Sequence, residues 1–109
     1  MGVDYAWEMF YGAIRLALVS DASLQKRLDT LISGVCHLQR DDFPDEHMWD
    51  EFRKLVNETT KGGTRQQGEK RVRSTISQMS DEEARECLRA AFDVFSHVAK
   101  AFGRTEFVI

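Results

Sequence analysis

The chain has 109 residues, of which 42% are hydrophobic and 30% are charged, and its formal net charge is −3. This composition indicates one globular domain and excludes a disordered chain. Because the net charge is mildly negative, binding to nucleic acid or to an anionic membrane would need a local basic patch. The sequence has only two cysteines, no signal-peptide pattern at its N-terminus and no apolar run that could span a bilayer. We therefore expect a soluble, cytoplasmic protein.

The first expected helix, at about residues 4–19, carries an unusually wide apolar surface. At helical spacing, one side is lined by Ala6, Met9, Phe10, Ala13, Leu16 and Ala17. The apolar surface continues around the back of the helix with Trp7, Tyr11, Ile14 and Leu18. Since this arc exceeds what one packing face requires, the pattern predicts either a central helix or an oligomer interface. Trp7, Tyr11 and Leu18 are the candidate partner-binding residues.

The second expected helix begins after Ser20 or Asp21, either of which can cap it. Its apolar residues form one narrow stripe, comprising Leu24, Leu28, Leu31, Ile32, Val35 and Leu38. A stripe of this width is typical of an ordinary bundle helix that buries a single face.

A third helix is expected to open with Pro44 at its first position, followed by Asp45 and Glu46 near the positive end of the helix dipole. Its apolar stripe consists of Met48, Trp49, Phe52, Leu55 and Val56. A fourth and weaker helical segment, at about residues 66–78, has few apolar positions and contains Gly68, which lowers helix propensity.

The last expected helix opens with a capping box, because Ser80 and Glu83 have the spacing that lets each side chain bond the backbone of the other. Gly103 is its expected end. The chain has a single proline and almost no alternating apolar pattern, which argues against a sheet. The sequence therefore predicts an all-α fold, a single-domain antiparallel bundle of four to five helices over residues 1–109, with a short C-terminal tail at 104–109.

The segment 61–73 departs from the helical pattern of its neighbours. It holds three of the seven glycines, and five basic residues stand against one acid. We predict a flexible, basic, glycine-rich connection at 60–68. The candidate nucleic-acid contacts in this region are Lys61, Arg65, Lys70, Arg71 and Arg73. However, no aromatic residue is interleaved for base stacking, and on a helix Arg71 would face away from Lys70 and Arg73. A solvated loop is the favoured interpretation.

No pattern for catalysis or metal binding is present in the sequence. His37 and His97 fall on polar helix faces and His47 at the edge of an apolar stripe, without the spacings of helical metal sites. Cys87 shares the apolar side of its helix, which predicts a buried structural thiol, while Cys36 cannot pair easily with the adjacent His37 on a helix. We therefore expect no catalytic residue, no metal site and no cofactor.

Two functional hypotheses follow from these features. The first is a small non-enzymatic module for protein–protein contacts, of the regulator, adaptor or inhibitor type, that forms a homodimer through its first helix. The alternative is a nucleic-acid-binding accessory protein that uses segment 61–73.

The segment 41–58 also carries seven carboxylates against two bases. Such a run can meet a basic partner, although a solvated face is the more common outcome. No membrane partner is expected.

Overall fold

The computed structural model describes residues 2–61 and 69–107 of the chain. These residues form five α-helices and one 3₁₀ helix and contain no strand, which confirms the predicted all-α bundle. In chain order the elements are α1 (Val3–Val19), α2 (Leu24–Val35), η1 (Arg40–Asp42), α3 (Glu46–Thr60), α4 (Glu69–Ile76) and α5 (Asp81–Phe107). No helix in the described ranges is both long and apolar enough to cross a membrane.

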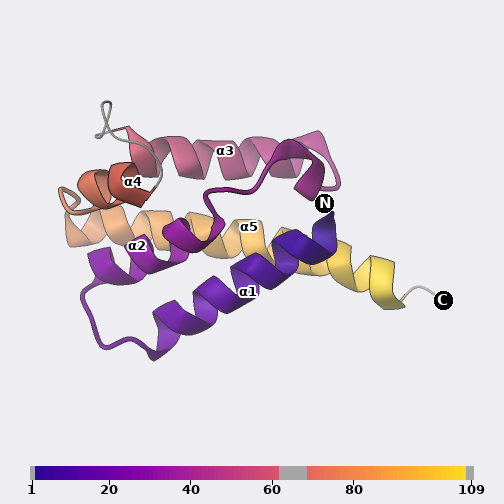
Figure 1. The fold of residues 1–109 in the computed structure, drawn as a ribbon, viewed down its shortest axis with the longest axis horizontal. Helices are drawn as coiled ribbons and strands as arrows, with labels where there is room; N and C mark the ends of the chain where they lie inside the picture. Colours follow the sequence, from indigo (N-terminus) through magenta and orange to yellow (C-terminus); the bar gives the residue numbers. More distant parts are fainter. Residues whose placement is uncertain (1, 62–68, 108–109) are drawn as a thin grey trace.

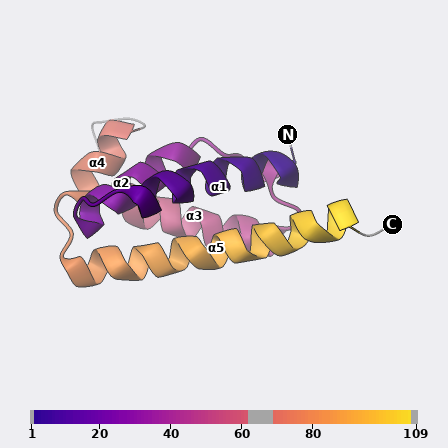
Figure 2. The same ribbon diagram turned by 90° about the horizontal axis from the view of Figure 1, so that it is seen from below.

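The four long helices alternate in direction, and the short α4 closes one end of the bundle (Figure 1). Helix α5 is the longest and packs against α1, α2 and α3, while α4 packs on α2 and α3. Both described ends of the chain lie at the end of the bundle opposite α4 (Figures 1 and 2).

The core is built from the apolar faces of these helices around a group of aromatic rings. Phe10 of α1 is fully buried and meets Phe52 of α3 edge-on, with ring centroids 6.1 Å apart. Phe43, which follows η1, packs on Phe52 at 4.8 Å. The predicted stripe of α2 is confirmed, because Leu28, Leu31, Ile32 and Val35 are all buried. Aromatic contacts of this kind add to the free energy that burial of apolar area supplies.

The structure corrects the predicted core face of α1. Leu16 was expected inside but is 63% exposed, whereas Ile14, expected on the back, is 6% exposed. The reason is the close approach of α2, where a Cβ atom built on Gly34 would lie 2.9 Å from the Cβ of Ala13. This contact turns the Ala13–Ile14 side of α1 inward and leaves Leu16 facing out.

Several helix ends also differ from the prediction. Ser23, and not Ser20 or Asp21, caps α2 by accepting a hydrogen bond from the Lys26 N–H at 3.2 Å. Asp45 caps α3, so Pro44 lies before the helix and not at its first position. The capping box of α5 is confirmed. The Ser80 N–H donates to Glu83 at 3.0 Å and the Glu83 N–H donates to the Ser80 hydroxyl at 3.1 Å.

The C-terminal end of α5 and the connection before α4 bear on the predicted domain organisation. Helix α5 runs through Gly103 to Phe107, so Gly103 does not end it and residues 104–107 of the predicted tail are helical. Helix α4 begins at Glu69. Most of the connection predicted at 60–68 lies outside the described residues, as do the last two residues of the chain.

Candidate functional site

The first candidate site is the outward side of α1. Four large apolar side chains are exposed there: Tyr11 at 43%, Leu16 at 63%, Leu18 at 65% and Val19 at 82%. We call these four residues the exposed α1 surface. They lie between the middle and the C-terminal end of α1, and this helix runs along one edge of the bundle (Figure 1). Of the three partner-binding residues predicted from the sequence, Tyr11 and Leu18 belong to this surface.

Trp7, the third predicted partner-binding residue, is held within the protein. Its ring stacks on Tyr11 with centroids 4.9 Å apart and on Phe102 of α5 with centroids 5.0 Å apart. The side chain is half-buried. The structure therefore places Trp7 at the margin of the exposed α1 surface, where it joins α1 to the end of α5.

The polar residues within the outward side of α1 are few and of opposite charge. Glu8 and Arg15 are exposed and lie seven positions apart on one helix face. The Arg15 guanidinium lies 5.7 Å from the centre of the Tyr11 ring. Between Glu8 and Arg15, a Cβ atom built on Gly12 would meet nothing within 4 Å. An approaching helix would therefore meet an open backbone position between one acid and one base.

The second candidate site is the set of basic residues predicted to contact nucleic acid, several of which have partners within the protein. Lys61 follows α3 and pairs with Glu58 at 2.9 Å, which raises the pKa of Lys61. Arg71 donates from Nε to the carbonyl oxygen of Thr60 at 2.8 Å, and Arg73 reaches Asp29 of α2 at 3.4 Å. Lys70 is exposed on α4.

Arg65, the fifth of these residues, lies outside the described part of the chain. The two described arginines therefore connect α4 to its neighbours, Arg71 to the end of α3 and Arg73 to α2. Lys70 and Arg73 line one hollow on α4 together with Ser74 and Ser77, whereas Arg71 is directed toward α3.

The third candidate site was not expected from the sequence. It is a groove of about 660 Å³ between α3 and α5, bounded at one end by the turn from α4 to α5. Its apolar floor is formed by Leu55, Met79, Cys87, Ala90 and Val94. Six carboxylates also line it: Glu51, Glu58, Glu82, Glu83, Glu86 and Asp93. Lys54 and Lys61 are the bases among the described lining residues, which together carry a formal net charge of −4.

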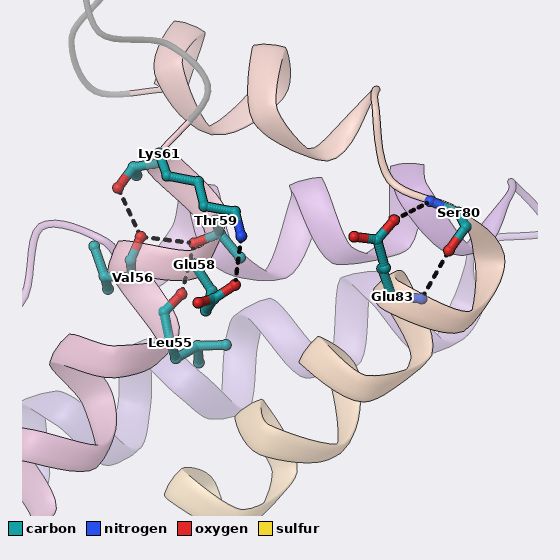
Figure 3. Close-up of polar contacts among 8 residues, drawn as sticks. Leu55, Val56, Glu58, Thr59, Lys61, Ser80 and Glu83 are labelled. Carbon is teal, nitrogen blue, oxygen red and sulfur yellow. Dashed lines mark hydrogen bonds and ion pairs between the residues drawn. The ribbon is translucent and has the colours of Figure 1, made fainter.

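Local hydrogen bonds position the residues at the α4 end of the groove (Figure 3). Thr59 is fully buried, and its hydroxyl donates to the carbonyl oxygens of Leu55 and Val56, at 2.9 and 3.1 Å. On the other side of the groove, Glu83 is held by the capping box with Ser80. The backbone N–H of Ser80 holds the pKa of Glu83 below its usual value, so this carboxylate is charged at neutral pH.

At the opposite end of the groove, a side-chain hydrogen bond joins α3 and α5. The Glu51 carboxylate lies 2.7 Å from Nδ1 of His97. His97 was predicted to lie on a polar helix face, and its side chain is 40% exposed. Sequence spacing alone could not show the contact between Glu51 and His97, which are 46 residues apart in the chain. The contact depends on the antiparallel alignment of α3 and α5.

Cys87 lies in the floor of the groove. Its side chain is half-buried, whereas the sequence predicted a buried thiol. Burial raises the pKa of this thiol, and the nearby Glu58 carboxylate raises it further. A thiol with a raised pKa is a poor nucleophile at neutral pH. The arrangement therefore suits packing against an apolar ligand better than covalent catalysis.

The described residues contain no group of three or more His, Cys, Asp or Glu side chains that could hold a metal ion. Comparison of the chain with protein-family models, with curated proteins and with solved structures gave no match. The fold and its surfaces define an all-α bundle with an exposed apolar helix on one side and an acidic, apolar-floored groove between two other helices.

Proposed function

We propose that this protein is a non-enzymatic protein–protein interaction module that forms a homodimer through the exposed α1 surface, and that it works in the cytoplasm. The observation that carries the proposal is the exposure of Tyr11, Leu16, Leu18 and Val19 along one helix. Several large apolar side chains exposed together on one element are typical of a contact site, whereas a single exposed apolar residue is normal on any protein surface. The two cysteines of the chain suit a reducing compartment.

The charges on α1 support a second copy as the partner. When two copies of α1 pack antiparallel about a point near Gly12, Glu8 of each copy lies beside Arg15 of the other. Such a contact is self-complementary, as a twofold dimer requires. The open backbone at Gly12 lets the two helices approach closely, because no side chain separates them there.

The test is light scattering coupled to size exclusion over a wide range of protein concentrations. We expect a dimer for the unaltered chain and a monomer for Leu18→Glu, because the buried carboxylate would lack a partner in the interface. Asn57→Glu, at an exposed position on α3, is the control and should remain dimeric. A chain that is monomeric at every concentration would contradict the proposal.

Nucleic-acid binding is the second candidate function, and the geometry supports it less. Arg71 and Arg73 are engaged with Thr60 and Asp29 within the protein. Binding to phosphates would therefore compete with contacts that hold α4 in place. The test is a titration with single- and double-stranded DNA and RNA at several salt concentrations. This function requires an affinity that falls steeply as salt rises.

A further inference from the structure

We propose that the groove between α3 and α5 is a binding site for an amphipathic helix that is rich in lysine or arginine, supplied by another protein. This site is separate from the exposed α1 surface and does not depend on the dimer. The proposal stands on three properties of the groove: its apolar floor, its length and the sign of the charge around it.

The floor and the length suit a helix. Five residues give the groove an apolar base, and two of them, Leu55 and Val94, are already buried by their neighbours. The lining follows α5 from Glu82 to Val94, which corresponds to about 18 Å at the rise of an α-helix. A bound helix of about three turns would place apolar side chains at positions i, i+4 and i+7 along this length.

The charge around the floor selects a basic helix. Five rim carboxylates are exposed on α3 and α5: Glu58, Glu82, Glu83, Glu86 and Asp93. Three of these five pair with a base one turn away in sequence, Glu58 with Lys61, Glu82 with Arg85 and Glu86 with Arg89. Exposed pairs of this kind contribute little stability, so their carboxylates can exchange partners at low cost. Lysines beside the apolar stripe of a bound helix would reach them.

The same charge argues against a second copy of this chain as the occupant. The helix that the chain presents outward is α1, whose exposed charged residues are Asp4, Glu8 and Arg15. A helix with two acids and one base does not complement a groove with a net charge of −4. A partner with several lysines or arginines does.

The experiment measures binding of a fluorescent synthetic helix to the full chain by anisotropy. The probe has leucines at i, i+4 and i+7 and lysines at the flanking positions. A second peptide keeps the leucines and replaces every lysine with glutamate. We expect the lysine peptide to bind and the glutamate peptide to bind at least roughly tenfold more weakly, with a difference that shrinks at high salt.

Charge-reversal variants test the location of the binding site. Glu86→Lys together with Asp93→Lys reverses the charge at two exposed rim positions. This double variant should bind the lysine peptide with an affinity that is lower by roughly tenfold or more. The control is Asp21→Lys with Glu46→Lys, which makes the same change of charge at exposed positions outside the groove. Circular dichroism confirms that both variants stay folded. Equal affinity for the two variants would overturn the proposal.

The thiol of Cys87 gives a second readout that depends on position and not on charge. In a Cys36→Ser background, alkylation of Cys87 by a neutral maleimide should slow when the lysine peptide is bound, because the peptide covers the floor. Unchanged labelling with saturating peptide would show that the peptide binds elsewhere. An apolar dye that enters the groove while neither peptide binds would show a small-molecule pocket instead. Either result rejects the helix-binding site and leaves the dimer proposal standing.

Discussion

Trp7 of α1 and Phe102 of α5 stack with their ring centroids 5.0 Å apart and their planes inclined by 13°. The two residues join the first and last helices at the end of the bundle where both described ends of the chain lie (Figure 2). Tyr11 stacks on the same indole at 4.9 Å. Trp7 therefore supports the exposed α1 surface from within, while Tyr11 and Leu18 are exposed on it.

Trp7→Ala should reduce stability without removing any side chain of the exposed α1 surface. Loss of a half-buried indole with two stacked neighbours should lower the free energy of unfolding by about 2 kcal/mol. Urea denaturation followed by circular dichroism measures this change. Trp7→Phe, which keeps an aromatic ring between Tyr11 and Phe102, should retain most of the stability. A variant as stable as the unaltered chain would show that the stack contributes nothing.

Substitution of Gly12 and of Gly34 by alanine should change the stability of the chain in opposite directions. At Gly12 the new methyl group meets nothing within 4 Å, so Gly12→Ala should stabilise the single chain by about 1 kcal/mol through helix propensity. At Gly34 it would lie 2.9 Å from Ala13, so Gly34→Ala should destabilise the chain by about 1–3 kcal/mol through overpacking between α1 and α2. Thermal unfolding of the two variants at low protein concentration tests this contrast. Melting temperatures that shift equally and in the same direction would contradict it.

Asp42 should make stability depend on pH in the acid range. Its side chain is 4% exposed and accepts the Gln39 N–H at 2.8 Å. Burial raises the pKa of this carboxyl, but opposing effects, which include hydrogen bonds from the backbone N–H groups of Gln39 and Gly2, hold the pKa below its usual value. The contribution of Asp42 is therefore fully present above the unfolded-state pKa and is lost as the pH falls through the lower folded-state value.

Asp42→Asn is the variant that tests this dependence. It should lower the free energy of unfolding by about 1–2 kcal/mol at neutral pH, because a charged acceptor becomes a neutral one. The difference from the unaltered chain should shrink at pH values below about 4. Asp50→Asn, at an exposed position on α3, is the control for loss of a carboxylate. A difference that stays constant with pH would contradict the role given to Asp42.

Arg71 should be a structural residue, in contrast with its neighbour Lys70. The Arg71 bond to the Thr60 carbonyl ties α4 to the end of α3, so Arg71→Ala should cost about 1 kcal/mol of stability. Lys70→Ala, on the exposed side of α4, should change stability by less than about 0.5 kcal/mol. Chemical denaturation of both variants checks this. Equal losses of stability in the two variants would show that Arg71 has no structural role.

Helix positions and one of the caps could be predicted from local sequence, because they depend on residues a few positions apart. The apolar stripe of α2 and the box formed by Ser80 and Glu83 are examples. The cap of α2 was misplaced because Ser20, Asp21 and Ser23 can all accept backbone hydrogen bonds. The path of the loop decides which of them does so.

The candidate sites depended on tertiary structure to different degrees. The wide apolar arc of α1 predicted either a central helix or an oligomer interface, but which side of the arc is buried depends on the approach of α2 at Gly34. Helical spacing already indicated that Arg71 faces away from Arg73, but only the structure shows their partners, Thr60 for Arg71 and Asp29 for Arg73. No sequence signal marked the groove, since its two walls come from separate helices.

The sequence by itself determined that this chain is a helical bundle and that its first helix has more apolar surface than one face needs. Both properties follow from side-chain periodicity, which is local. Only the tertiary structure decided that Leu18 faces out, that Trp7 is held by Phe102 and that Glu58 and Glu86 border one apolar floor. These relationships arise from the alignment of helices distant in the chain, which is set by packing and not by the periodicity of any one segment.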